Sequence, residues 1–369
     1  MMGNKKVLYI TNVPSPYRVN YFNELSKYCD LTVIYERDSA SDRDIKWKEE
    51  DNKKYNIIFL DGYKFKTDFI VSNGIKKHLK NNKYEFIIFC NFASPSGILG
   101  INYCIKHNIK YCIEGDGAFY LKKSLKDIIK KRLLKNALYC FSTCNNLDEY
   151  YLNLGVSKNN IKRYRFTSLS NDEIINNSSL TNNIDELKNK LHLNYKKILL
   201  FVGQFIKRKG IDILLESFSK LPSDGIGLVI IGGEPIDEYI EIMNKYNLKN
   251  IHFYTFMNKK EMDDYFRISN LFILPTREDI WGLVVNEALS YGVPVITTDR
   301  CNAGLELIKN DYNGYIVKSN DIDELSIAIN NLLSGNGSLR DNCLKSIEQY
   351  TIENMVKDHL EVFNTDGKE

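Results

Sequence analysis

The stretch "LFILPTREDIWGLVVNEALSYGVPVI", residues 271–296, decides the fold class of this chain. It begins and ends with short apolar runs that are typical of buried strands, and the segment between them has the apolar spacing of a helix. A strand, a helix and a second strand in this order indicate an α/β protein with a parallel sheet. The same stretch also carries two acids at the ends of the helical segment, Asp279 and Glu287.

The rest of the chain repeats this pattern in both halves. Runs such as "KVLYIT", "EFIIFC", "KILLFVG" and "GLVIIGG" alternate with amphipathic segments. Nearly continuous apolar strands are typical of parallel sheets covered on both faces. The chain has 369 residues, which suits two domains. We therefore predict two doubly wound, Rossmann-like domains facing a central cleft, with the first at residues 1–170, a polar linker at 171–190 and the second at 191–345. An amphipathic helix within residues 346–369 is expected to join the first domain.

Composition excludes several classes of protein. The 50 basic and 47 acidic residues nearly balance, so the net charge does not call for a nucleic acid partner. Eight cysteines are scattered without paired spacing, which favours free thiols in a reducing compartment. The first residues lack the features of a signal peptide, and no run has the length of a membrane span. We expect a cytoplasmic protein or one peripheral on the inner face of the cell membrane, and no metal site.

The loop and helix of the opening stretch are the first candidate site. Ligands of open α/β sheets bind at the carboxyl ends of the strands, where a helix start offers unpaired N–H groups. We expect such a start at Trp281, Gly282 and Leu283. Glu287 lies on a narrow polar strip with Asn286 and Ser290, which faces either a ligand or bulk water.

These residues strongly resemble glycosyltransferase family 4, retaining enzymes of the two-domain GT-B fold. "REDIWGLVVNEALSYGVPVI" is similar to the family's motif of two acids separated by seven residues, and "FVGQFIKRKGIDILLESF" to its diphosphate segment. The resemblance covers most of residues 197–345. "NVPSPYRVNYFNEL" looks more loosely like members from bacterial surface-polysaccharide clusters.

The resemblance implies a role for each residue around a nucleotide-sugar. Glu287 is expected to accept hydrogen bonds from two ribose hydroxyls, and Asp279 to hold hydroxyls of the donor sugar. Lys209 is expected to neutralise the leaving diphosphate. Because the family usually has Glu where Asp279 stands, the neighbouring Glu278 is an alternative for that position. The remaining expected donor contacts are Gly203, Gln204, Arg208, Trp281, Gly282, Leu283 and Val284, with Arg208 or Arg277 replacing the family's usual arginine, which is Gln204 here.

The acceptor side is expected in the first domain. "YCIEGDGAFY" stands where many family members carry a histidine, but it offers Glu114 and Asp116 instead. An ordinary Gly-Asp-Gly turn explains it equally well. In "TNVPSPYRV", Arg18 could reach an acceptor phosphate, while Ser15 followed by a proline is equally consistent with a simple helix N-cap.

A basic amphipathic helix is expected at residues 121–138. Its apolar residues lie on one predicted face, and seven cations crowd the rest beside one acid, Asp127. Such a helix is typical of a surface that contacts anionic lipid, although a core-packed helix with a solvated face is the commoner case.

The resemblance therefore implies a retaining glycosyltransferase without a cofactor or metal. Its co-substrate is a nucleotide-diphosphate sugar, with UDP expected, and its acceptor is a lipid-linked glycan in cell-surface polysaccharide synthesis. Two alternatives stay open. One is a non-catalytic subunit that binds a glycan or another transferase. The other is an epimerase or hydrolase of the same fold.

Overall fold

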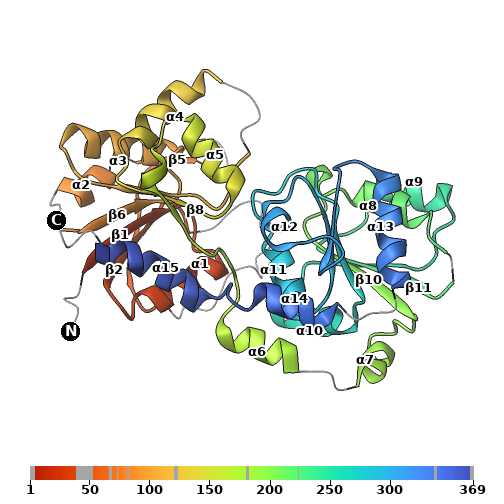
Figure 1. Cartoon of the computed structure of the whole chain (residues 1–369). Coiled ribbons are helices and arrows are strands. Elements are labelled where there is room, and N and C mark those ends of the chain that lie inside the picture. The colour runs from red at the N-terminus through yellow and green to blue at the C-terminus, as the bar shows by residue number, and fades with distance from the viewer. Residues whose placement is uncertain are drawn as a thin grey trace. The chain divides into compact units, whose positions relative to one another are not determined.

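The computed structural model describes residues 5–38, 53–65, 69–72, 74–80, 83–119, 124–179, 183–222, 224–335 and 339–365. The chain divides into two compact units (Figure 1). The first contains Met1–Phe166 and Ile352–Glu369, and the second contains Thr167–Thr351.

The first unit is built on a parallel sheet. In the described part of the chain its spatial order is β3-β2-β1-β6-β7-β8-β9, with a separate antiparallel pair, β4 and β5. Buried aliphatic and aromatic side chains fill its central strands. Its strands are β1 (Lys6–Thr11), β2 (Asp30–Tyr35), β3 (Asn56–Phe59), β4 (Tyr63–Phe65), β5 (Phe69–Val71), β6 (Phe86–Phe89), β7 (Cys112–Glu114), β8 (Cys140–Ser142) and β9 (Ile161–Arg163).

Helices of the first unit come from both ends of its sequence. Helix α15, blue in Figure 1, lies beside α1 although more than 300 residues separate them in the chain. The helices are α1 (Pro16–Leu25), α2 (Gly74–Lys80), α3 (Pro95–Lys106), α4 (Lys126–Lys135), α5 (Asn145–Asn153) and α15 (Ile352–Thr365), with a 3₁₀ turn at Lys158–Asn160.

The second unit has a parallel sheet with the order β12-β11-β10-β13-β14-β15 among the residues described. Its strands are β10 (Lys197–Val202), β11 (Ile226–Ile231), β12 (Ile251–Tyr254), β13 (Leu271–Leu274), β14 (Val295–Thr298) and β15 (Gly314–Val317). Its helices are α6 (Asn171–Ser179), α7 (Ile184–Lys190), α8 (Ile211–Phe218), α9 (Asp237–Lys245), α10 (Lys259–Ile268), α11 (Leu283–Ser290), α12 (Asn302–Leu307), α13 (Ile322–Ser334) and α14 (Arg340–Ile347), with a 3₁₀ turn at Lys207–Lys209.

Both sheets have the strand order of doubly wound folds, in which the chain winds outward first in one direction and then in the other. The prediction of two doubly wound parallel sheets is therefore confirmed. The direction changes between β1 and β6 in the first sheet, and between β10 and β13 in the second. Ligands of such sheets bind at this switch point, outside the carboxyl ends of the strands.

Residues 171–190, expected as a linker, hold helices α6 and α7 and belong to the second unit. Glu173 explains why α6 forms in such a polar segment, because its carboxylate accepts a hydrogen bond from the backbone N–H of Ser170 at 2.7 Å. In return, the Ser170 hydroxyl accepts from the N–H of Glu173 at 3.3 Å. This reciprocal pair caps the helix start.

Candidate functional site

The switch point of the second sheet brings Lys209 and Asp279 together. Lys209 ends the loop after β10, and Asp279 lies in the loop after β13. Their side chains form an ion pair with 2.5 Å between Lys209 Nζ and Asp279 Oδ2. Arg208 adds a second cation, with Nη1 3.9 Å from Asp279 Oδ1. Two residues 70 positions apart thus place a cation and a carboxylate where a ligand of this fold is expected.

Backbone hydrogen bonds fix the loop after β13 against the loops after β10 and β14. The N–H of Arg277 donates to the carbonyl of Arg208 at 2.7 Å, and the N–H of Asp279 donates to the carbonyl of Arg300 at 2.7 Å. Gly210, just after Lys209, has φ of +74°, and a Cβ there would lie 2.1 Å from the carbonyl oxygen of Pro275. Only glycine permits this close approach of the two loops.

The predicted helix start is confirmed. Helix α11 begins at Leu283, after Gly282 with φ of +104°. A Cβ on Gly282 would lie 2.8 Å from Cys301 Sγ, so glycine is needed for both conformation and space. The first N–H groups of a helix have no partner inside the helix, and the N-terminal end of the helix dipole is positive. The start of α11, with Leu283 and Val284 in its first turn, is therefore suited to bind an anion.

The polar strip on α11 is buried, and the alternative that it faces bulk water is wrong. Asn286 and Ser290 are fully buried, and Glu287 is 9% exposed. Trp281 points inward, because its Nε1–H donates to Asn286 Oδ1 at 3.0 Å. Burial raises the pKa of Glu287, whereas Lys259 and a hydrogen bond from Ser168 act in the opposite direction.

The other expected donor contacts have different environments. Glu278 is half-buried, and its carbonyl accepts a hydrogen bond from Arg208 Nη1 at 2.5 Å. Gly203 and Gln204 are also half-buried, in the loop after β10. Arg277 is not placed beside Asp279, since its guanidinium makes two hydrogen bonds to Asp212 at 2.8 and 2.6 Å. Of the two candidate second cations, Arg208 is therefore the one near the acid.

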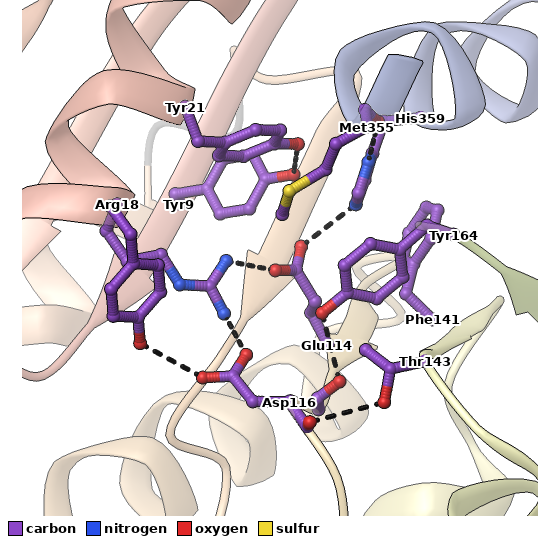
Figure 2. A network of polar contacts seen from close by, with 12 residues as sticks. Tyr9, Arg18, Tyr21, Glu114, Asp116, Phe141, Thr143, Tyr164, Met355 and His359 are labelled. Atoms are coloured by element: carbon purple, nitrogen blue, oxygen red, sulfur yellow. Dashed lines mark hydrogen bonds and ion pairs between the residues drawn. The ribbon is translucent and has the colours of Figure 1, made fainter. Parts of the chain in front are cut away.

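In the first unit, the expected acceptor-side residues form a buried polar network (Figure 2). Arg18 of α1 points between Glu114 at the end of β7 and Asp116 in the following turn, and its guanidinium pairs with both carboxylates. Tyr17 donates from its hydroxyl to Asp116 Oδ2 at 3.2 Å. Arg18 is only 3% exposed, so in this structure it is a buried partner of two carboxylates and not a surface cation.

His359 completes this network and was not anticipated from the sequence. It lies on α15, with Nε2 3.1 Å from Glu114 Oε2 (Figure 2). The available signal was its spacing, because His359 stands at helical intervals from Ile352, Met355, Val356 and Phe363, all of which are buried. A histidine on the apolar face of a helix indicates a buried polar partner elsewhere in the chain.

The two carboxylates of this network have opposite pKa shifts. Burial alone would raise the pKa of Glu114, but Arg18 and His359 outweigh it and lower the pKa to about 2. Burial raises the pKa of Asp116, and Glu114 adds to this, although Arg18 opposes it. Asp116 is the most exposed member of the charged group, with 24% of its side chain accessible. It is therefore the carboxylate in this network best placed to meet a ligand.

Ser15 occupies the N-cap position of α1, and Pro16 is the first helical residue, as the simple capping hypothesis predicts. The Ser15 side chain makes no capping hydrogen bond, and the residue is buried. Its backbone N–H donates to the carbonyl of Val13 at 2.9 Å.

The predicted basic helix is present as α4, Lys126–Lys135, while residues 121–123 lie outside the described part of the chain. Its apolar residues do not share one buried face. Leu133 and Leu134 are buried, but Leu125, Ile128 and Ile129 are 86%, 71% and 53% exposed. The exposed cations beside them are Lys126, Lys131, Arg132 and Lys135.

No helix in the described ranges has the length and apolar character to cross a membrane. Within the same ranges, no group of three or more histidine, cysteine or acidic side chains is arranged to hold a metal ion.

The family model for glycosyl transferases group 1 matches residues 183–350. A 41.2 kDa protein of the cps region of Klebsiella pneumoniae is 30% identical over 198 residues, which cover 53% of this chain and 52% of that protein. The capsular polysaccharide biosynthesis glycosyltransferase CapM of Staphylococcus aureus is 27% identical, with 67% of this chain and 68% of CapM covered. The matched segment thus spans about half of the Klebsiella protein and two thirds of CapM.

The fold also matches solved structures. Anabaena HepE, solved in complex with UDP and glucose, superposes with a TM-score of 0.79 at 12% identity, covering 98% of this chain and all of HepE. This likeness confirms the GT-B fold, with its two parallel α/β sheets. The motif residues and the family model agree, and residues 183–350 of this chain form a domain of the glycosyl transferases group 1 family, glycosyltransferase family 4.

Proposed function

We propose that this chain is a retaining glycosyltransferase that moves a sugar from a UDP-sugar to a lipid-linked glycan in cell-surface polysaccharide synthesis. The pairing of Lys209 with Asp279 beside the start of α11 carries this proposal. The choice of UDP is supported by HepE, whose structure contains UDP and glucose. The choice of pathway is supported by CapM, a capsular polysaccharide enzyme.

The diphosphate of the donor would be bound by positively charged groups. Lys209 and the N–H groups at the start of α11 stabilise the negative charge that grows on the diphosphate as the glycosidic bond breaks. Arg208 supplies a further cation nearby. Because these groups are positive without a metal, the reaction is proposed to need none, and activity should survive chelation with EDTA.

The two acids would bind hydroxyls. Glu287 offers two carboxylate oxygens, which suit the vicinal ribose hydroxyls. Asp279, held by Lys209, orients the sugar. Between Asp279 and Glu278, the geometry favours Asp279, because its carboxylate and not that of Glu278 faces the phosphate lysine. Gly203, Gln204 and the backbone at Trp281 complete the proposed donor contacts.

The acceptor would approach the first unit at the network of Figure 2. There Asp116 would meet an acceptor hydroxyl, while Arg18, which is itself held by Glu114, keeps that carboxylate in place and Ser15 shapes the neighbouring helix start. No enzymic base is assigned to the acceptor proton, which the leaving diphosphate can take.

A transfer assay tests this function. Purified chain is incubated with UDP-sugars and a lipid extract of the source cells, and sugar is followed from nucleotide to lipid. We expect Lys209→Ala to lower transfer at least a hundredfold, since an electrostatic contact to the transition state contributes about 3–4 kcal/mol. Glu287→Ala should weaken donor binding, since a hydrogen bond to a charged group contributes about 1.5–3 kcal/mol. Lys220→Ala removes a distant, exposed lysine and should leave transfer unchanged. Free sugar or an epimer formed at full rate without an acceptor would instead identify a hydrolase or epimerase.

Helix α4 is proposed to hold the enzyme at the anionic membrane surface where such an acceptor resides. Leu125, Ile128 and Ile129 expose apolar area beside four cations, a combination that binds anionic lipid. The double variant Ile128→Ser, Ile129→Ser should sediment less with vesicles containing phosphatidylglycerol. Ile327→Ser on α13 removes another exposed isoleucine and serves as the control. Equal sedimentation of all three proteins would contradict membrane binding through α4.

A further inference from the structure

Ser168 contacts the proposed ribose-binding acid. Its hydroxyl donates a hydrogen bond to Glu287 Oε1 at 2.9 Å, and both residues are more than nine-tenths buried. Ser168 is the second residue of the second unit, just after the chain leaves the first. It belongs to neither of the motifs that carry the family resemblance.

Ser168 is itself held in place. Lys259 Nζ at the start of α10 donates to the carbonyl of Ser168 at 3.1 Å and pairs with Glu173 Oε1 of α6 at 2.6 Å. Two residues farther along, Ser170 caps α6 through the reciprocal hydrogen bonds with Glu173. The backbone around Ser168 is thereby tied to α6 and α10, so its hydroxyl is a fixed donor and not a mobile surface group.

A fixed donor matters at Glu287 because a buried glutamate side chain has three rotatable bonds and an ionised carboxylate that needs hydrogen-bond partners. Oxygen Oε1 of Glu287 accepts a hydrogen bond from the Ser168 hydroxyl. This bond selects one orientation of the carboxylate and also favours its ionised form, the form that accepts hydrogen bonds from hydroxyls.

We infer that Ser168 is a positioning residue for donor recognition, whose hydroxyl orients Glu287 so that the carboxylate accepts the hydroxyls of the nucleotide ribose. The inference rests on the proposed role of Glu287. Ser168, which lies where the second unit begins, would thus help to distinguish a ribonucleotide from the same nucleotide without its ribose hydroxyls.

The experiment is calorimetric titration of the full chain with UDP and with 2′,3′-dideoxy-UDP. Wild-type protein should bind UDP more tightly than the dideoxy analogue. Ser168→Ala should weaken UDP about five- to tenfold, because the Glu287 side chain must then be ordered when UDP binds, and should leave the dideoxy analogue unchanged. In a Glu287→Ala background, adding Ser168→Ala should have no further effect on UDP. Ser168→Thr, which keeps the hydroxyl, should restore most of the preference.

A merely structural serine gives a different result. Ser217 is a matched control, because it is also fully buried in the second unit and its hydroxyl donates to the carbonyl of Ile322 at 3.1 Å. Ser217→Ala should lower the thermal midpoint without changing the preference for UDP. Equal weakening of both ligands by Ser168→Ala, or no weakening, overturns the positioning role while leaving the role of Glu287 intact. If wild-type protein binds both nucleotides equally or binds neither, Glu287 does not read a ribose, and both proposals fall.

Discussion

His359 and Glu114 form a fully buried pair, with 3.1 Å between Nε2 and Oε2. The other ring nitrogen, Nδ1, lies 2.8 Å from the carbonyl oxygen of Met355, which can only accept a hydrogen bond. Nδ1 therefore donates to Met355, and Nε2 faces a carboxylate that is also paired with Arg18. The network therefore places Arg18 between two carboxylates, Glu114 and Asp116, with His359 as a second partner of Glu114 (Figure 2).

Removing one member of this buried network should destabilise the fold. We expect His359→Leu to reduce the free energy of unfolding by about 3–5 kcal/mol, because it leaves Glu114 buried with one partner fewer. Urea denaturation followed by circular dichroism measures this loss. His107→Gln changes an exposed histidine on the same unit and should stay within about 0.5 kcal/mol of wild type. A loss below 1 kcal/mol for His359→Leu would contradict a stabilising role of the His359–Glu114 contact.

Acid should weaken the same network. The pKa of Glu114 is lowered to about 2 in the folded chain, below its ordinary value of 4.5. A carboxyl group whose pKa is lowered by folding stabilises the fold fully at a pH above its pKa in the unfolded chain. This contribution is lost as the pH falls from about 4.5 toward 2. The stability difference between wild type and Glu114→Gln should therefore shrink between pH 5 and pH 3 in denaturation experiments. A difference independent of pH would show that the ionised form of Glu114 contributes nothing.

The stability that Glu36 contributes should change with pH in the opposite direction. Burial raises its pKa to about 7, although hydrogen bonds from Ser94 and Asn91 oppose the shift. With a folded pKa above the ordinary 4.5, the contribution of this group is present at low pH and is lost as the pH rises through about 7. Glu36→Gln, which cannot ionise, should gain about 1–3 kcal/mol relative to wild type between pH 5 and pH 8. The same relative stability at both pH values would refute the shift.

The turn before α11 should tolerate no side chain. Gly282→Ala places a Cβ against Cys301 Sγ at a positive φ, so we expect a loss of about 1–3 kcal/mol and weaker UDP binding. Gly335→Ala is the matched control, since a Cβ there meets only ordinary contacts. Thermal denaturation and calorimetry of both variants give the comparison. Unchanged UDP affinity in a folded Gly282→Ala variant would separate this turn from the donor site.

Much of the fold could be predicted from the sequence because its signals are local. The apolar runs at β1, β6, β10, β11 and β13 are long enough to identify buried strands without any tertiary information. The start of α11 at Gly282 was also predictable, because a glycine before an apolar helix marks the turn. The acid spacing and Lys209 were recognisable through the family resemblance.

Other features depend on contacts between distant parts of the chain. His359 meets a carboxylate 245 residues away, and Ser168 meets one 119 residues away, so no local pattern identifies either partner. The exposure of Leu125, Ile128 and Ile129 was missed for a similar reason. A helical pattern shows which residues share a face, but packing against the rest of the unit decides which residues of α4 are buried, and these are Leu133 and Leu134. Arg277 is likewise a candidate second cation by sequence, but its pairing with Asp212 is visible only in the structure.

The most direct test of the proposed donor site is a crystal structure of the chain with bound UDP. We expect the diphosphate at the start of α11 within hydrogen-bond distance of Lys209 Nζ, and the ribose hydroxyls on Glu287. UDP bound elsewhere on the chain, or a diphosphate that leaves Lys209 paired only with Asp279, would contradict the assignment of this switch point as the nucleotide-sugar site.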